Sequence, residues 1–317
     1  MINKEKKILI TGASGFVGGN LVRSLVNQGF KNINIIVRET SNLWRLYDIK
    51  EKININYVSL LDIEKLNLYI FDLKPQIIFH LAAAGANIGR DSRGVIDIFE
   101  QNVLGTINLI NACKEVGFEY FINTGSSSEY GQKDTPMKET DVLEPNNEYG
   151  ITKSTTTMYS TFIGKKYNLS IYTFRLFSVY GYFEDKKRLI PTLIQNYLNL
   201  KSSNLSTPNS VRDYIFIDDV IEYYLNIDKL SGDFGGIYNI GNGIQYSIGE
   251  IVEKIKNISK SNINPVYGVE SIKQNEPKLW VSDNKKATDI FGINHTSIDK
   301  GLEKTYNWFK NNLQFYK

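Results

Sequence analysis

Tyr149 and Lys153 are the two residues whose types and spacing most directly suggest chemistry. They lie four positions apart, so a helix through this stretch would place them on one face. A lysine ammonium beside a phenol favours the phenolate and lowers the pKa of the tyrosine, which makes it a usable acid–base group near neutral pH. The spacing alone is weak, because the chain contains 20 tyrosines. A glycine-rich turn near the start of the chain, and a serine cluster between that turn and Tyr149, strengthen the interpretation of the pair as catalytic.

The serine cluster consists of Ser126, Ser127 and Ser128. It follows the apolar residues 120–124, which predict a buried strand. Side chains at the carboxyl end of such a strand lie in the crevice where α/β sheets bind ligands. A serine hydroxyl there can hydrogen-bond a substrate oxygen and hold it against the tyrosine.

Gly12, Gly15 and Gly18 give the spacing Gly-x-x-Gly-x-x-Gly between a predicted strand, residues 8–11, and a predicted helix, residues 18–28. Such glycines allow a tight turn, a close approach of the backbone to a pyrophosphate, and close helix–strand packing. The start of the helix adds free N–H groups and a positive dipole end for the anion. The turn therefore predicts a dinucleotide cradle. Its contacts are assigned to Gly12, Ser14, Gly15, Phe16, Val17 and Gly18.

The residue after the second predicted strand, residues 33–37, reads the adenosine ribose in dinucleotide folds. An acidic side chain there bonds the 2′-hydroxyl, whereas an arginine accommodates a 2′-phosphate. Arg38 occupies this position, 20 residues after Gly18, and favours NADP over NAD. Glu39 keeps NAD open, because the acid would reach the ribose if the strand ended one residue later.

Apolar runs typical of buried strands alternate with helical patterns through the first half of the chain. The runs lie at residues 8–11, 33–37, 55–58, 77–80, 120–124 and 171–175, and the longer helical patterns at 95–116 and 152–166. This alternation predicts an α/β protein with a Rossmann-type, doubly wound parallel sheet. We assign residues 1–180 to an NAD(P)-binding domain. The alternation of strand and helix patterns ends at about residue 180. Residues 181–317 are therefore assigned mainly to a smaller C-terminal substrate lobe, although the chain could cross between lobes.

Composition narrows the function classes. The 317 residues carry a net charge of +3 without a block of basic residues, which gives no reason to expect nucleic-acid binding. No apolar run approaches membrane-spanning length and no signal peptide is recognisable, so no membrane partner is expected. The single cysteine, Cys113, favours a cytoplasmic location. With only two histidines, His80 and His295, we expect no metal site.

Several short motifs occur in one order along nearly the whole chain. Besides the glycine turn, the serine cluster and Tyr149 with Lys153, they are His80-Leu81-Ala82-Ala83, Asn102-Val103-Leu104-Gly105-Thr106, Arg175-Leu176-Phe177-Ser178-Val179-Tyr180-Gly181, Arg212-Asp213-Tyr214 and Tyr238-Asn239-Ile240-Gly241. In this combination the sequence resembles an extended short-chain dehydrogenase/reductase of the nucleotide-sugar epimerase, dehydratase and reductase group.

The resemblance implies roles for the catalytic residues. Tyr149 would exchange a proton with the substrate oxygen, while Lys153 would bind the nicotinamide ribose and lower the pKa of the tyrosine. Ser126 matches the serine or threonine that orients the substrate, with Ser127 as the alternative if the alignment slips by one.

The resemblance also implies further contacts with the two ligands. The cofactor is expected to meet Ala82, Ala83 and Asn102, with Asn102 ordering the backbone there. The nucleotide-sugar substrate is expected to meet Ser127, Ser128, Ser178 and Arg212. A guanidinium at the last position suits the phosphates of the sugar nucleotide.

Departures from the group narrow the reaction. Its 4,6-dehydratases carry an Asp-Glu pair where this chain has Ser127 and Ser128, and Glu129 comes one place too late. Loss of water from the sugar needs a second acid–base pair, so dehydration is not expected. Ser178 stands where many members carry Asn, and Ser59 where an Asp often reads the adenine, which leaves those contacts open.

Two reactions remain. A reductase would deliver hydride from NADPH to a nucleotide-linked 4-keto-6-deoxyhexose, with Tyr149 as proton donor. Arg38 favours it, as does Gln274-Asn275-Glu276, which resembles a segment of reductases acting on CDP-linked 4-keto-6-deoxyhexoses. An epimerase would keep NAD bound and invert C4. A non-enzymatic alternative is a catalytically silent NAD(P)-binding regulatory protein. The intact set of Ser126, Tyr149 and Lys153 argues against it.

The remaining expectations concern packing. His80 is expected to be structural and Cys113 to lie in the core, and Trp280 to lie in the second lobe or at its interface. The resemblance implies a homodimer in which the helices at 95–116 and 152–166 pair into a four-helix interface.

Overall fold

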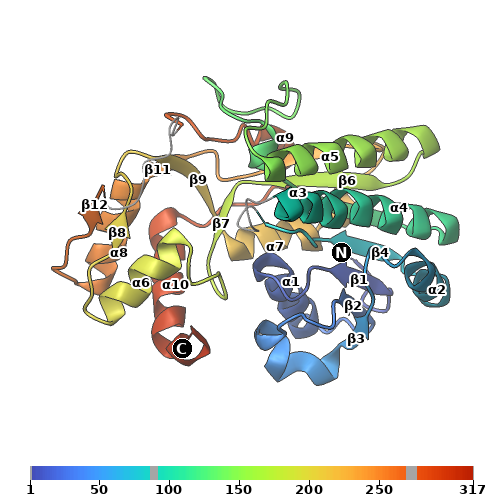
Figure 1. The fold of residues 1–317 in the computed structure, drawn as a ribbon, viewed down its shortest axis with the longest axis horizontal. Coiled ribbons are helices and arrows are strands. Elements are labelled where there is room, and N and C mark those ends of the chain that lie inside the picture. The colour runs from blue at the N-terminus through green and yellow to red at the C-terminus, as the bar shows by residue number, and fades with distance from the viewer. Residues whose placement is uncertain (1, 86–91, 269–276, 317) are drawn as a thin grey trace.

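The computed structural model describes residues 2–85, 92–268 and 277–316, and its main feature is a seven-stranded sheet (Figure 1). The strands are β1 Ile8–Thr11, β2 Ile33–Val37, β3 Asn54–Tyr57, β4 Ile77–His80, β5 Tyr120–Ser126, β6 Ile171–Leu176 and β10 Ile237–Ile240. All pairs are parallel, in the order β10-β6-β5-β4-β1-β2-β3. The order reverses between β1 and β4, where such sheets bind nucleotides. The prediction of a Rossmann-type parallel sheet is confirmed.

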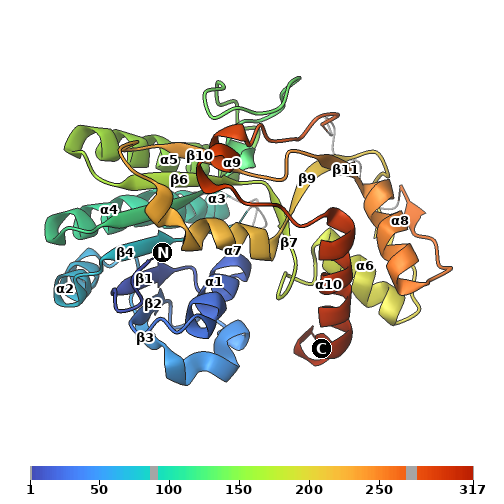
Figure 2. The same ribbon diagram turned by 180° about the vertical axis from the view of Figure 1, so that it is seen from behind.

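Helices cover both faces of this sheet. On one side lie α2 Ile63–Leu73, α3 Ser92–Phe99, α4 Gly105–Val116 and α5 Glu148–Tyr167, and on the other α1 Phe16–Asn27 and α7 Ile217–Leu225 (Figures 1 and 2). In β1, Ile8 and Ile10 pack with the α1 side, whereas Leu9 packs with the α4 side. Because both faces are covered, every residue of β1 is buried, which explains its continuous apolar run.

In its described residues, the second lobe contains two small sheets and three helices. One sheet holds β7 Ser178–Tyr180, β9 Val211–Phe216 and β11 Gln245–Ser247 in the order β11-β9-β7, and the other pairs β8 Asn204–Leu205 with β12 Val266–Tyr267. The helices are α6 Leu189–Leu198, α8 Ile248–Ser259 and α10 Ile298–Asn312. Figure 2 shows α10 beside α6, with the C-terminal end of the chain below them. Short 3-10 helices lie at Trp44–Lys52, Ser127–Glu129, Ile227–Lys229 and Leu313–Tyr316.

The chain passes between the two lobes more than once. It leaves the main sheet after β6, returns as α7 beside α1, and completes the sheet edge with β10, against which α9 Lys285–Phe291 packs. The lobes also meet through side chains, because the amide of Asn20 in α1 donates to the carbonyl of Tyr182 at 2.9 Å. The main sheet therefore draws on both halves of the sequence.

Several element ends differ from the predicted ones. The strand expected at 55–58 lies at Asn54–Tyr57, and the strand expected at 120–124 continues to Ser126. The helix expected at 152–166 begins at Glu148, because Asn147 caps it by accepting the N–H of Gly150 at 2.8 Å.

One further stretch is more divided than expected. The helix expected at 95–116 is interrupted by a π-helical turn, Glu100–Leu104, which separates α3 from α4. Within the described residues, no helix combines the length and the apolar character needed to cross a membrane.

Candidate functional site

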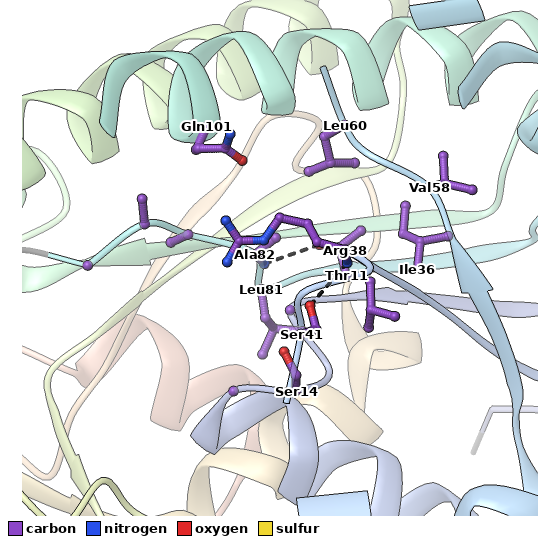
Figure 3. Close-up of a pocket in the computed structure, with 16 residues that line it drawn as sticks. Thr11, Ser14, Ile36, Arg38, Ser41, Val58, Leu60, Leu81, Ala82 and Gln101 are labelled. Atoms are coloured by element: carbon purple, nitrogen blue, oxygen red, sulfur yellow. Dashed lines mark hydrogen bonds between the residues drawn. The ribbon is translucent and has the colours of Figure 1, made fainter. Parts of the chain in front are cut away.

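A pocket of about 350 Å³ opens at the carboxyl ends of β1, β2, β3 and β4, next to the reversal of strand order (Figure 3). It is lined by Thr11, Gly12, Ser14, Gly15, Ile36, Val37, Arg38, Ser41, Val58, Leu60, Leu81, Ala82, Ala83, Ala84, Gly85 and Gln101. Of the residues assigned to the cofactor from sequence, Gly12, Ser14, Gly15, Arg38, Ala82 and Ala83 line it. Phe16, Val17, Gly18, Asn102, Tyr149 and Lys153 are not among these lining residues.

The glycine turn forms one wall of the pocket, and two of its glycines are required by space. A Cβ on Gly12, whose φ is +71°, would lie 2.5 Å from the backbone N of Ala82. A Cβ on Gly18 would lie 2.3 Å from the carbonyl oxygen of Gly12. Gly15 caps α1, and the first turn of that helix carries no acidic residue. The turn and the start of α1 therefore fit a phosphate group.

Arg38 follows β2 directly and points into the pocket (Figure 3). Its backbone N–H donates to the hydroxyl of Ser41 at 3.0 Å, which fixes the turn after the strand. Glu39 is not among the described residues that line the pocket. The strand end thus places the arginine, and not the acid, at this pocket.

Apolar residues that the sequence reasoning did not single out form the far end of the pocket. Ile36, Val58 and Leu60 line it at the ends of β2 and β3. Ser59 turns its hydroxyl to its own loop, where it accepts the N–H of Leu61 at 3.2 Å. Their position in the sequence could have indicated this role, because residues at the carboxyl ends of strands next to the reversal of strand order face the ligand crevice.

His80 lies in a buried chain of hydrogen bonds beneath the pocket. Its ring nitrogens bond the hydroxyls of Thr11 at 2.7 Å and Thr106 at 2.8 Å, and Thr11 accepts the N–H of Ala82 at 3.1 Å. Burial, and secondarily the charge of Lys153, lowers the pKa of His80 to about 3. The histidine is therefore neutral and structural, as expected.

Asn102 connects the pocket to α5 from within the π-helical turn. Its amide oxygen accepts the N–H of Ala84 at 2.6 Å, and its amide nitrogen donates to the hydroxyl of Thr152 at 2.9 Å. Thr152 in turn donates to the carbonyl of Tyr149 at 2.8 Å. These contacts suit the expectation that Asn102 orders backbone beside the cofactor.

Tyr149 lies in the first turn of α5, against the serine cluster that ends β5. Gly150 allows this approach, because a Cβ there would lie 2.4 Å from the carbonyl oxygen of Ser128. The hydroxyl of Ser126 lies near enough to the phenol of Tyr149 to lower its pKa, and Lys153 lies one turn further along the helix, almost fully buried. The structure thus brings the three expected catalytic residues together.

The electrostatics of the pair differ from the expectation. Burial raises the pKa of Tyr149, and the hydrogen bond with Ser126 offsets this only in part. Burial also lowers the pKa of Lys153 to about 8, against the opposing effect of Glu129. The prediction that the lysine lowers the pKa of the tyrosine is therefore wrong for this structure. Tyr149 is half-buried and Lys153 almost fully buried, so both lose hydration, which disfavours either charged form.

The other two serines have different partners. The indole N–H of Trp280 donates to the hydroxyl of Ser127 at 3.1 Å, so Ser127 joins the serine cluster to the C-terminal segment. The backbone N–H of Ser128 donates to the hydroxyl of Ser126 at 3.1 Å. Trp280 therefore lies at the interface between the lobes, which was one of its two expected positions. Its contact with Ser127 could not be predicted from the spacing of the residues in the sequence.

Arg212 lies on the second lobe next to the same tryptophan. Its guanidinium carbon is 5.3 Å from the ring centroid of Trp280, and the group donates to the carbonyl of Val211 at 2.6 Å. Ser178 begins β7 opposite Tyr214 of β9. The segment at 274–276, which resembled a reductase segment, lies outside the described residues.

Comparisons with known proteins agree with this arrangement. A family model described as "NAD dependent epimerase/dehydratase family" matches residues 8–241. A dTDP-D-glucose 4,6-dehydratase of Dictyostelium discoideum is 26% identical, over 100% of this chain and 85% of its own length. A trifunctional UDP-glucose 4,6-dehydratase, epimerase and reductase of Arabidopsis thaliana is 27% identical over 99% of this chain, which spans only 48% of that enzyme.

Solved structures share the whole fold. The UDP-glucuronic acid 4-epimerase of Bacillus cereus, in complex with UDP-glucuronic acid and NAD, superposes with a TM-score of 0.85 at 25% identity, over 96% of this chain and 99% of that one. The UDP-glucose 4-epimerase of Thermotoga maritima gives a TM-score of 0.87 at 24% identity, over 97% and 99%. Since the family model spans the glycine turn, the serine cluster and Tyr149 with Lys153, the chain belongs to the NAD dependent epimerase/dehydratase family.

Proposed function

We propose that this protein reduces a nucleotide-linked 4-keto-6-deoxyhexose, with NADPH as the hydride source and Tyr149 as the proton donor. The observation that carries the proposal is Arg38, which lines the cofactor pocket directly after β2. A guanidinium there suits the 2′-phosphate that distinguishes NADP from NAD.

The catalytic set fits a reduction. A bound nicotinamide supplies a hydride to the carbonyl carbon. Ser126 holds the carbonyl oxygen beside the hydroxyl of Tyr149. Because burial raises the pKa of Tyr149, the phenol keeps its proton at neutral pH and can donate it to the developing alkoxide. Lys153 would hold the ribose hydroxyls of the cofactor beside the phenol.

The sugar nucleotide is proposed to lie between the serine cluster and the second lobe. Arg212, whose guanidinium stacks on Trp280, would bind the phosphates. Ser128 and Ser178 would contact the sugar. Ser127 would shape the site through its bond with Trp280.

Dehydration is not proposed, although curated relatives carry that activity in their names. Ser127 and Ser128 supply no acid, and the carboxylate of Glu129 is fully buried and paired with Arg175 at 2.7 Å. A carboxylate held in this way cannot reach a sugar hydroxyl.

Epimerisation at C4 with retained NAD is the second candidate. It is favoured by the likeness to the Bacillus cereus 4-epimerase, whose structure contains NAD. The cofactor content of the purified protein distinguishes the two candidates. NAD that copurifies and is released only by denaturation supports the epimerase, whereas a freely exchanging cofactor with a preference for NADPH supports the reductase.

The test of the reductase is turnover. Consumption of NADPH is measured across keto-sugar nucleotides with CDP, dTDP, UDP and GDP as the carrier. Tyr149→Phe is expected to lower kcat by roughly 100-fold or more, because the proton donor is lost, while NADPH affinity stays unchanged. Near-native turnover in that variant would remove Tyr149 from the mechanism, and cofactor binding without any turnover in the wild type would favour the regulatory protein.

Arg38→Ala is expected to reduce the preference for NADPH over NADH by roughly 10- to 100-fold, because a charged hydrogen bond to the 2′-phosphate is lost. Fluorescence titration with each cofactor measures it. The matched control is Glu39→Ala, which should leave the preference unchanged. If Glu39→Ala instead weakens NADH binding, the acid reads the ribose and the cofactor is NAD.

Three further proposals concern the division into domains, the oligomeric state and the location of the protein. Residues 1–180 would form the NAD(P)-binding part and residues 181–317 mainly the substrate lobe, with β10 returning to the main sheet. Exposed apolar side chains on α3, the π-helical turn and α5 support a homodimer. The single buried cysteine, Cys113, suits a cytoplasmic location.

A further inference from the structure

One buried carboxylate, that of Glu129, contacts both the serine cluster and α5. Its Oε1 accepts the backbone N–H of Ser126 at 2.8 Å and the hydroxyl of Thr157 at 3.0 Å. Thr157 follows Lys153 by one turn of α5, so the two share a helix face. Glu129 therefore fixes Ser126 relative to the helix that carries Tyr149 and Lys153.

The second carboxylate oxygen is held by a cation. Nε of Arg175 in β6 donates to Oε2 of Glu129 at 2.7 Å, and both residues are at most 1% exposed. The same guanidinium donates to the hydroxyl of Tyr130 at 2.8 Å, which donates to the amide oxygen of Asn239 at 2.7 Å. A network satisfied at every step is rigid, so the carboxylate is held in one place.

The backbone leaves room for this carboxylate. A Cβ on Gly125 would lie 2.6 Å from Oε1 of Glu129 and 3.1 Å from Cγ of Arg175. A simple ion pair would need only Arg175 as a partner. The additional bonds to Ser126 and Thr157 place the negative charge beside the residues assigned to catalysis.

The charge acts on both members of the acid–base pair. It raises the pKa of Lys153 against the effect of burial, and it raises the pKa of Tyr149. The other groups around them act differently: Arg188 favours the phenolate of Tyr149, and His80 is neutral because burial lowers its pKa to about 3. Of the described groups acting on Lys153, Glu129 is the one that favours the ammonium.

We propose that Glu129 is a positioning residue that keeps Lys153 charged and holds Ser126 in place for the reaction. The proposal rests on the proposed roles of Ser126, Tyr149 and Lys153 and adds a residue that touches neither ligand. It gives the carboxylate a function beyond its ion pair with Arg175.

The test compares Glu129→Gln, which removes the charge, with Glu129→Asp, which keeps the charge but draws it away from Ser126 and Thr157. NADPH affinity is measured by fluorescence titration as a function of pH. In the wild type, affinity should weaken as the pH rises through about 8, where Lys153 loses its proton. In Glu129→Gln this loss should occur about 1 pH unit lower. Lys153→Met should lack it.

Glu129→Asp separates the two parts of the role. Its pH profile of NADPH binding should stay close to that of the wild type, because the charge is retained. Its kcat with the keto-sugar nucleotide should fall by roughly 10-fold or more, since Ser126 loses its anchor. A purely structural ion pair would leave the pH profiles of both variants alike.

The matched control is Glu139→Gln. Glu139 is a half-buried glutamate, which accepts the N–H of Asn239 at 2.8 Å at the far side of the same network. This variant should keep the wild-type pH profile. If Glu129→Gln also keeps it, if Glu139→Gln shifts it equally, or if the wild type shows no alkaline loss of affinity, the proposal is wrong.

Folding and function are kept apart in this design. If Glu129→Gln does not fold, as judged by circular dichroism, Glu129→Gln with Arg175→Gln replaces it, because that variant leaves no unpaired buried charge. Since cofactor binding needs no substrate, a shifted profile without any keto-sugar turnover would uphold the role of Glu129 and reject the proposed reductase. Turnover of the keto-sugar nucleotide, with no shift in the pH profile of NADPH binding in Glu129→Gln, would uphold the reductase and reject the role of Glu129.

Discussion

At the scale of single residues, Glu184 in the loop after β7 illustrates how the fold sets a proton equilibrium. Its side chain is 5% exposed, and its Oε2 has no hydrogen-bond partner within the described chain. Burial raises its pKa from 4.5 to about 8, with Arg188 opposing the shift from 3.7 Å. At neutral pH the folded protein therefore holds this carboxyl mostly protonated.

The sign of the stability effect follows from this raised pKa. Between pH 4.5 and about 8 the folded state binds more protons at Glu184 than the unfolded state, so the free energy of unfolding falls as the pH rises through this window. Glu184→Gln removes this term, and its melting temperature relative to the wild type should rise between pH 5 and pH 8.5. Asp185→Asn, at the exposed neighbour, is the control. A melting difference that does not change with pH would contradict the prediction.

At the scale of elements, the start of α1 depends on one glycine far more than on the next. A Cβ at Gly18 would lie 2.3 Å from a backbone oxygen, whereas a Cβ at Gly19 would lie 3.3 Å from its nearest neighbour, Cβ of Arg45. Gly18→Ala should therefore destabilise the protein by about 1–3 kcal/mol and weaken NADPH binding, since the turn must shift.

Gly19→Ala is the matched variant in the same helix turn. Alanine favours a helix by about 1 kcal/mol relative to glycine, so this change should be close to neutral or stabilising. Thermal unfolding and NADPH titration compare the two variants. Equal losses in both would mean that the tight approach of Gly18 to Gly12 is not what holds the cradle.

Local patterns predicted most of the elements, and contacts distant in sequence explain what they missed. The runs in β1, β2 and β4 were found because strands buried on both faces are mostly apolar. The start of α5 was missed because it depends on the Asn147 cap, and the bond between Trp280 and Ser127 joins residues 153 positions apart.

The proximity of the proposed catalytic residues was expected from their motifs, but their electrostatics were not. Tyr149, Lys153 and Ser126 share motifs that can be read directly from the sequence. The raised pKa of Tyr149 comes mainly from burial, which depends on how several separate elements close around it. Spacing shows which groups meet, whereas hydration is a property of the assembled site.

At the scale of the whole molecule, α3, the π-helical turn after it and α5 expose apolar side chains. On α5, Ile151, Met158 and Phe162 are spaced to share one face, and Met158 is 64% and Phe162 55% exposed. Ile96 of α3 and Leu104 are also exposed. A second copy of this chain would cover the surface, as the family resemblance implies.

Met158→Glu is expected to convert the proposed dimer to a monomer, because a carboxylate cannot be buried unpaired in an apolar interface. Size-exclusion chromatography with light scattering measures the mass. Leu68→Glu on α2, where the leucine is 68% exposed, should leave the mass unchanged. A wild type that is monomeric at every concentration would disprove the dimer.

The return of the chain as β10 to the edge of the main sheet has a consequence for synthesis. A ribosome that has released residues 1–180 has made every strand of that sheet except β10, whose place is beside β6. Until residues 237–240 emerge, β6 presents an open hydrogen-bonding edge of the kind that recruits other chains. The nascent protein should therefore depend most on chaperones during this interval, and a chain truncated at residue 180 should aggregate instead of folding alone.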